Sequence, residues 1–520
     1  MAPNMSELVH KDSTSAIATF FSNKTIFVTG ATGFVGKCLL EKLVRSCPDI
    51  DRIHVLIRGK HNVTPQERLT KLCSCPLFDT IRLINPNFAS KFNAMEGDVT
   101  LPNFGLSKTD EALLIEKCHI VFHSAATIRF DEPLRNAMQI NVGSVAKLIE
   151  LCTKMASVQA VIHVSTAYAN CNESHIEEAV YPTSIAPEQL LKACEWMDTS
   201  MLDLITPELI RHLPNTYTFT KGLAEAYLNT HAQHLPLAIF RPSIIGPTWQ
   251  EPVPGFIDNY SGYTGIIVAS VSGFMRVMNA NPTIQPNCIP ADVVINTMIT
   301  LAWHTATQAS RQPLRQKADM LPVIHCCAAG RRSNNKSVSS QQYIDIIAEQ
   351  LDSHKIAFQR CLRWPELTLI TNKYVYGIRH FFQEVIFAYL LDLIMIITKN
   401  KPIFVRLLNK MTKSLQVLDF FSNNNWTFAS ENSEKLFDIM STNEIDRQLF
   451  NFDVQDLNWV EYIRNHVLGV KKYLLKDDMD RMTQCYERNL RLKLAQQLIS
   501  AILLTFLSLA FIHTVKHIVV

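Results

Sequence analysis

The chain lacks several features that would assign a protein to a class at once. Its 50 Lys and Arg residues nearly balance its 47 Asp and Glu residues, so its overall charge gives no basis for binding nucleic acid. Its thirteen cysteines form no CxxC pair and no repeated spacing, which argues against a disulfide framework or a structural zinc site and indicates a reducing compartment. We therefore expect neither a metal centre nor a nucleic-acid partner.

Two motifs of hydrolytic enzymes are also absent. The chain contains no GxSxG elbow and no HExxH pair. An acyltransferase or a hydrolase would then have no activated nucleophile. The N-terminal residues contain no apolar segment, so we expect no secretory signal.

A long uncharged segment lies near the C-terminus. Residues 494–515 contain no Asp, Glu, Lys or Arg, and most of them are apolar. At about 1.5 Å per residue, a helix of this length just crosses a hydrocarbon core of about 30 Å. We expect a tail anchor that contacts membrane lipid and leaves the rest of the chain on the cytosolic side. A buried or interfacial helix is the alternative, because glutamines, serines and threonines dilute the segment.

A second apolar run, HFFQEVIFAYLLDLIMIITK, contains two acidic residues. Glu384 and Asp392 are eight positions apart, close to a whole number of helical turns, so they share one face of a helix. We predict a core helix or a membrane-surface helix here rather than a membrane span.

The order of apolar runs predicts the fold class. Short β-branched runs alternate with amphipathic helical stretches over the first 300 residues, which indicates an α/β fold with a parallel sheet covered on both faces. After about residue 355 the strand pattern fades and helical segments take over. The expected parts are a disordered N-terminus, a nucleotide-binding domain that includes an irregular substrate-side segment, a mostly helical domain and the tail helix, at residues 1–20, 21–350, 355–478 and 494–515.

The stretch TIFVTGATGFVGKCLLEKL predicts a phosphate-binding turn. Gly30, Gly33 and Gly36 lie between a strand and an amphipathic helix, which is the context of the first unit of a Rossmann-type, doubly wound sheet. Glycines permit the tight turn and the close approach of a pyrophosphate, and the helix N-terminus supplies free N–H groups. We expect a dinucleotide here, bound by residues of the turn that also include Thr29, Thr32 and Phe34.

The end of the second strand indicates which dinucleotide binds. An NAD site has an acidic residue there for the ribose 2′-hydroxyl, whereas this chain has HVLIRGK, with Arg58 at the strand end and Lys60 close by. A guanidinium pairs well with a 2′-phosphate, so the sequence favours NADPH. The alternative is that Arg58 is a solvated strand end.

Tyr217 and Lys221 are the candidate reacting residues. They are four apart in a predicted helix, which puts the phenol and the ammonium on one face. A nearby cation would lower the pKa of the phenol, which could then protonate a carbonyl oxygen as hydride arrives at carbon. Ser165 and Thr166 follow the strand VIHV and offer hydroxyls to the same oxygen.

Together these motifs resemble the extended short-chain dehydrogenase/reductase family. The glycine turn matches the family's TGxxGxxG pattern, and by position in VST the catalytic hydroxyl falls on Thr166, with Ser165 in reserve. The resemblance also implies adenine contact by Asp98, cofactor contact by Lys221 through a ribose hydroxyl, and a structural or active-site Asn141. The remaining cofactor contacts that it implies are Ala125, Ala126, Pro242 and Ser243.

Further motifs narrow the resemblance to the animal fatty acyl-coenzyme A reductases. Segments such as AATIRFDEPLRNAMQINV, YTFTKGLAE and RPSIIGPTWQEPVPGFIDN carry it from about residue 20 to 480, although the stretch 326–340 departs from the usual lead into the second domain. It implies NADPH-dependent reduction of a long-chain acyl-CoA through an aldehyde to a fatty alcohol, for ether-lipid and wax synthesis. It also implies a second domain of the sterility type and a place in the peroxisomal membrane.

Two other functions stay open at this point. A sterol or sugar-nucleotide reductase of the same extended family would use the same residues, and an inactive membrane-bound paralogue would bind the cofactor without turnover. The sequence leaves open the preferred acyl length and saturation, the released product and a homo-oligomeric state.

Overall fold

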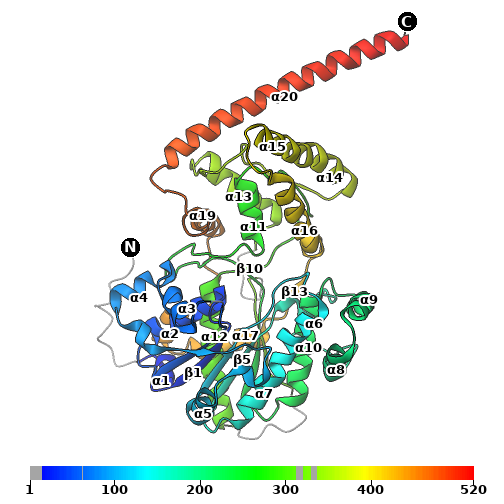
Figure 1. The fold of residues 1–520 in the computed structure, drawn as a ribbon. Coiled ribbons are helices and arrows are strands. Elements are labelled where there is room, and N and C mark those ends of the chain that lie inside the picture. Colours follow the sequence, from blue (N-terminus) through cyan, green and yellow to red (C-terminus); the bar gives the residue numbers. More distant parts are fainter. Residues whose placement is uncertain (1–13, 61, 312–319, 329–336, 520) are drawn as a thin grey trace. The chain divides into compact units, whose positions relative to one another are not determined.

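The chain folds into two compact units. The computed structural model describes residues 14–60, 62–311, 320–328 and 337–519 (Figure 1). The sheet unit comprises Met1–Pro254, Asn287–Ser337 and Asn425–Leu457, and the helical unit comprises Gly255–Pro286, Val338–Asn424 and Asn458–Val520. The units are interleaved in sequence, whereas the sequence predicts a single boundary near residues 350–355. Within the atypical stretch 326–340, residues 329–336 lie outside the described residues.

Long-range backbone pairing explains part of this interleaving. Strand β13 (Thr427–Phe428) pairs in parallel with β6 (His175–Ile176), which brings residues 425–457 into the sheet unit. Such pairing joins segments about 250 residues apart, for which local periodicity gives no signal.

The sheet unit is built on seven parallel strands in the order β11-β7-β5-β4-β1-β2-β3. The chain runs outward from β1 in one direction and then returns to β4 on its other side. The carboxyl ends of β1 and β4 therefore mark the point where the strand order reverses, which is where open α/β sheets bind ligands. The strands are Thr25–Thr29, Arg52–Ile57, Phe92–Glu96, Ile120–His123, Ala160–Val164, Leu237–Pro242 and Val323–Cys326 for β1, β2, β3, β4, β5, β7 and β11.

Helices cover the sheet, as the blue, cyan and green ribbons of Figure 1 show. Central strands such as β1 and β5 are buried along their whole length, which is why they read as continuous apolar runs. The prediction of a doubly wound α/β fold is confirmed. The principal helices of this unit are α2 (Phe34–Ser46), α3 (Pro65–Cys73), α4 (Asp79–Ile84), α5 (Lys108–Lys117), α7 (Ser144–Lys154), α8 (Pro187–Trp196), α9 (Thr199–Ile210), α10 (Thr216–His231), α12 (Ala291–Arg311) and α17 (Glu431–Met440).

The N-terminal segment is more ordered than the sequence predicts. Helix α1 spans Ala16–Phe21, within the predicted disordered stretch 1–20, and residues 1–13 lie outside the described residues. The Asp446 carboxylate accepts hydrogen bonds from the Ser15 hydroxyl and from the first backbone N–H groups of α1. Ile17 and Phe21 are fully buried. Ser15 caps the helix locally by accepting the backbone N–H of Ala18 at 2.8 Å, and the contact with Asp446, about 430 positions away, adds what the local sequence does not show.

The helical unit is mostly α-helical. Its one short sheet in the described residues pairs β9 (Val277–Asn279) with β12 (Thr368–Ile370). His466 ties its helices together, with its ring nitrogens 3.0 Å from the Thr264 hydroxyl and 2.8 Å from the Tyr343 hydroxyl. The main helices are α11 (Tyr263–Val271), α13 (Ser340–Asp352), α14 (Lys373–His380), α15 (Ile386–Ile397), α16 (Phe404–Asn423), α19 (Trp459–Gly469) and α20 (Met482–Val519).

Two segments bear on the membrane predictions. Among the described residues, the continuous helical segment Lys373–Ile397 is the one that is long and apolar enough to cross a membrane by length and composition. Helix α20 is continuous to Val519, so the backbone of the predicted anchor 494–515 is helical (Figure 1). Most side chains after residue 502 lie outside the described residues, and the anchor stays a prediction.

Candidate active site

The glycine turn joins β1 to α2 at the point where the strand order reverses. Gly30 has a φ of +74°, and a Cβ placed there would lie 2.7 Å from the backbone N of Ala125. A Cβ on Gly36 would lie 2.4 Å from the carbonyl oxygen of Gly30. Only glycine fits both positions, and α2 then begins directly after Gly33 with no acidic residue in its first turn. This is a backbone cradle that suits an anionic phosphate group.

Thr29 is buried, unlike Thr32 and Phe34 in the same turn. Its side chain is fully buried, and its hydroxyl lies 2.9 Å from Nδ1 of His123 and accepts a hydrogen bond from the backbone N–H of Ala125 at 3.3 Å. Thr29 therefore fixes the end of β4 beside the turn. Thr32 is exposed, whereas Phe34, Ala125 and Ala126 are half-buried.

Arg58 and Asp98 come together at the ends of neighbouring strands. Arg58 follows β2 and Asp98 lies just beyond β3, and the guanidinium lies 3.8 Å from the Asp98 carboxylate. The Arg58 side chain is 70% exposed, so an anion from solvent can reach it. Asp98 is held by the backbone N–H and the hydroxyl of Thr100, at 2.9 and 2.8 Å. Pro242 and Ser243 are buried at the end of β7.

Tyr217 lies in the first turn of α10. That helix begins at Asn215, whose side-chain oxygen accepts the backbone N–H of Thr218 at 2.9 Å. Burial raises the pKa of Tyr217 to about 12, although a hydrogen bond with the Thr166 hydroxyl acts to lower it. The sequence predicts a lowered pKa for Tyr217, whereas the pKa in the folded protein without ligand is raised. The loss of water around the phenol outweighs the effect of its polar neighbours. The Phe130 ring stacks on the Tyr217 ring with centroids 5.6 Å apart.

Lys221 lies one turn further along α10 and is buried. Its Nζ donates a hydrogen bond to the Val164 carbonyl at the end of β5, at 2.8 Å. Burial lowers the pKa of Lys221 to about 8, against the Glu225 carboxylate, which raises it. Glu225 in turn pairs with the buried Arg241 through two hydrogen bonds, at 2.9 and 2.6 Å. The amine is thus held near β5 in a dry environment, where a change of its charge has a large effect.

Asn141 connects three parts of the site. It lies on the π-helical turn Met138–Gly143, where the wider backbone breaks the α-helical pattern. Its side-chain oxygen accepts the backbone N–H of Thr127 at 3.0 Å, and its amide donates to the Thr220 hydroxyl at 2.9 Å. Asn141 therefore links the loop after β4 to the residue that precedes Lys221. Its hydrogen bonds hold these two segments together.

The structure distinguishes the two candidate hydroxyls that follow β5. Thr166 is close enough to the Tyr217 phenol to lower its pKa, and its hydroxyl also accepts the backbone N–H of Tyr168 at 3.3 Å. The Ser165 hydroxyl is buried and makes no hydrogen bond with any described residue. Among the candidates the geometry thus favours Thr166.

His163 is a buried histidine close to Lys221 that sequence reasoning did not single out. It lies on β5 next to Val164, is buried, and its ring nitrogens have no hydrogen-bond partner among the described residues. Burial lowers its pKa well below the usual value, and the Lys221 charge lowers it further. Its ring stacks on His123 with centroids 5.5 Å apart. In the sequence, the only sign of His163 is a histidine within the apolar run AVIHV, and a histidine in such a strand is not specific for a functional site.

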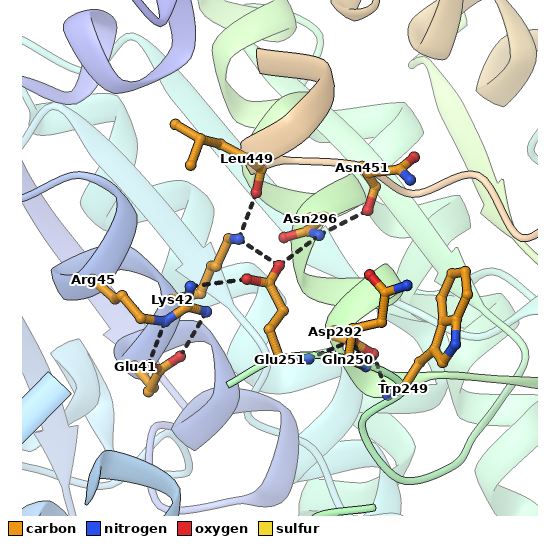
Figure 2. Close-up of polar contacts among 10 residues, drawn as sticks. All are labelled: Glu41, Lys42, Arg45, Trp249, Gln250, Glu251, Asp292, Asn296, Leu449 and Asn451. Carbon is orange, nitrogen blue, oxygen red and sulfur yellow. Dashed lines mark hydrogen bonds and ion pairs between the residues drawn. The ribbon is translucent and has the colours of Figure 1, made fainter. Parts of the chain in front are cut away.

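A buried charged cluster supports the glycine turn from the far end of α2 (Figure 2). The Glu251 carboxylate pairs with Lys42 at 2.5 Å and with Arg45 at 2.8 Å, both on α2. The Asp292 carboxylate accepts three backbone N–H groups of residues 249–251. The cluster fixes α2 against this segment. No spacing rule joins residues 42 and 251, so the sequence did not predict it.

Comparisons with known proteins give a consistent result. Two family models, both described as male sterility protein, match residues 28–298 and 383–477. The chain is 38% identical over 483 residues to fatty acyl-CoA reductase 2 of Bos taurus, with 92% of this chain and 90% of the bovine protein covered. It is 39% identical over 467 residues to fatty acyl-CoA reductase 1 of Xenopus laevis, with 89% and 87% covered.

Solved structures match the fold at low sequence identity. The terminal R domain from the myxalamid PKS-NRPS biosynthetic pathway gives a TM-score of 0.57 at 16% identity, over 88% of this chain and 93% of that domain. The reductase (R) domain of a non-ribosomal peptide synthetase from Mycobacterium tuberculosis gives 0.53 at 17% identity, over 87% and 94%. At these identities the likeness supports the fold alone.

Proposed function

Because this chain belongs to the fatty acyl-CoA reductases, a family of oxidoreductases, we propose that it reduces a long-chain acyl-CoA to a primary fatty alcohol and free CoA with NADPH. The observation that carries the residue roles is the arrangement around α10. Thr166 acts on the Tyr217 phenol, and Tyr217 lies one helical turn from the buried Lys221, which bonds the end of β5. Strand β5 pairs with β4, and the chain that follows β4 lies against the glycine turn.

The cofactor would be held by residues that fit its parts. The glycine turn offers backbone N–H groups to the pyrophosphate, and its missing Cβ atoms leave room for close approach. Asp98 would contact the adenine and Lys221 a ribose hydroxyl. Arg58 would pair with the 2′-phosphate, which is the basis for NADPH over NADH. When bound, the nicotinamide supplies the hydride.

Tyr217 would act as the general acid. A pKa of about 12 keeps the phenol protonated at neutral pH, so it holds a proton ready for the carbonyl oxygen as negative charge develops there. Thr166 would orient that oxygen, and the Lys221 ammonium would stabilise the phenolate that remains. The first reduction gives a hemithioacetal that loses the thiol, and the second reduces the aldehyde. Hydride is the nucleophile, so no cysteine is required.

The cellular setting is part of the same proposal. The uncharged segment 494–515 would anchor the protein in the peroxisomal membrane, with the catalytic part facing the cytosol. The alcohol would then feed ether-lipid and wax synthesis. A homo-oligomer is compatible with this arrangement.

Product analysis tests the function. The full chain in detergent is given NADPH and a panel of acyl-CoAs, and free CoA, aldehyde and alcohol are measured together. We expect two NADPH consumed and one CoA released for each alcohol formed. Turnover of a sterol or a sugar nucleotide without acyl-CoA turnover would identify another extended short-chain reductase, and NADPH binding without any turnover would identify an inactive paralogue.

A further inference from the structure

The helical segment Lys373–Ile397 has its polar face turned inward. The Glu384 carboxylate accepts the backbone N–H groups of Arg276 and Val277, at 2.7 and 3.0 Å, and lies 2.7 Å from Nδ1 of His380. Glu384 is 1% exposed. These contacts join the segment to β9 within the helical unit.

Asp392 is used in the same way on the same face. It is buried, and its carboxylate accepts the first three backbone N–H groups of the α16 end, those of Ile403, Phe404 and Val405, at 2.8, 2.8 and 3.0 Å. A negative charge at a helix N-terminus is favourable. Both acids thus bind backbone groups of the helical unit, which confirms the predicted shared face.

The opposite face is apolar and exposed. Each of the following six side chains on this segment is more than half exposed: Phe381, Phe382, Leu390, Leu393, Ile394 and Ile397. Isolated apolar residues are normal on a protein surface, but a continuous group on one helix marks an interaction site. Four of the six lie on α15 and two on the π-helical turn Phe381–Val385 that joins α14 to α15, and we call the group the apolar face of α14 and α15.

The exposed charges near the apolar face are mainly positive, and Asp419 of α16 is an acid that lies 3.8 Å from one of them, Lys373. From residue 373 to 413 the chain has seven Lys and Arg and two acids. All seven cations are exposed, including Lys399, Lys401 and Arg406, whereas the two acids are Glu384 and Asp392, both buried. The exposed surface of this stretch is therefore apolar and positive, which matches the boundary between acyl chains and anionic headgroups.

One residue links this segment to the start of the tail. The backbone N–H of Arg276 binds Glu384, and its guanidinium donates to the Gln496 side chain at 3.0 Å. Gln496 lies within the uncharged segment 494–515. The point where the proposed anchor begins is thus within one side-chain length of the helix that carries the apolar face.

We propose that the apolar face of α14 and α15 lies in the headgroup region of an anionic bilayer, parallel to its surface, as a membrane contact additional to the tail. A membrane-spanning position of Lys373–Ile397 is disfavoured, because Glu384 and Asp392 would lose their hydrogen bonds to backbone N–H groups. A second copy of the chain is a poor occupant, because the exposed cations near the apolar face, such as Lys399 and Lys401, would meet like charges of the other copy.

Site-specific photo-crosslinking tests this contact. A benzophenone amino acid is placed at Ile394 in the full chain, which is reconstituted into vesicles that contain anionic phospholipid. Leu83 on α4 is the matched control, because it is also apolar and exposed but lies in the sheet unit. We expect a lipid adduct from position 394 and none above background from position 83.

A charge variant distinguishes the contributions of charge and apolar contact. Each basic residue near an anionic surface strengthens partitioning by about fivefold, so K399Q/K401Q should lower the lipid adduct at position 394, and neutral vesicles should lower it further. No lipid adduct at 394, or an adduct to a second copy of the chain in its place, would overturn the proposal. A yield that is the same on neutral and anionic vesicles would also overturn it.

Discussion

The buried amine of Lys221 opposes folding, and Lys221→Met should therefore stabilise the protein while it removes activity. Burial lowers the pKa of Lys221 from 10.5 to about 8. A shift of this size corresponds to a cost of about 3 kcal/mol for the charged amine. Methionine removes that cost but leaves the Val164 carbonyl without its donor, which costs about 1–3 kcal/mol. The net result at pH 7 is a gain of about 1 kcal/mol in the free energy of unfolding.

The pH dependence gives this prediction its sharpest test. Below pH 8 the amine is protonated in both the folded and the unfolded chain, so the wild type bears the full cost. Between pH 8 and 10.5 the unfolded chain binds more protons than the folded chain, so wild-type stability rises with pH. The advantage of Lys221→Met should therefore shrink over this range and then change sign.

Unfolding by urea, measured from pH 7 to pH 10 in detergent, checks the effect. Lys192→Met is the matched control, because Lys192 is exposed on α8 and its replacement should change stability by less than about 0.5 kcal/mol at every pH. A stability difference between Lys221→Met and the wild type that does not vary with pH would refute the assignment of a costly buried charge.

Three further predictions concern the cofactor-binding residue Arg58, the hydroxyls after β5 and the charged cluster at α2. Arg58→Ala should weaken NADPH binding about tenfold and NADH binding little, measured by fluorescence titration, because only NADPH carries the 2′-phosphate; equal weakening would contradict the role of Arg58. Thr166→Ala should lower kcat about a hundredfold and Ser165→Ala much less, since Thr166, not Ser165, lowers the pKa of the Tyr217 phenol; the reverse order would make Ser165 the catalytic hydroxyl. Glu251→Ala should cost about 3 kcal/mol of stability in urea unfolding, because it leaves the buried Lys42 without its carboxylate; a loss near zero would show that water reaches the cluster.

The residues of the candidate site come from local motifs. The glycine turn, the Tyr217/Lys221 pair and the hydroxyls after β5 are each encoded within a few residues, and the strand order brings them to one edge of the sheet. The face shared by Glu384 and Asp392 was also predictable, because helical periodicity alone fixes it.

Features that depend on long-range contacts were not predictable. Helix α1 is held partly by the distant Asp446, and α2 is fixed by Glu251, more than 200 positions away. The interleaving of the two units follows from pairings such as that of β6 with β13. The raised pKa of Tyr217 was missed because spacing shows which groups are near but not how much water is lost.

The role of Tyr217 is the central claim, and single-turnover reduction by Tyr217→Phe tests it most directly. The variant keeps the aromatic ring that stacks on Phe130 and loses only the hydroxyl. With NADPH in excess and either acyl-CoA or fatty aldehyde supplied, both reductions should slow by about a hundredfold or more while NADPH affinity stays within about twofold. Alcohol formation at the wild-type rate would show that another group delivers the proton.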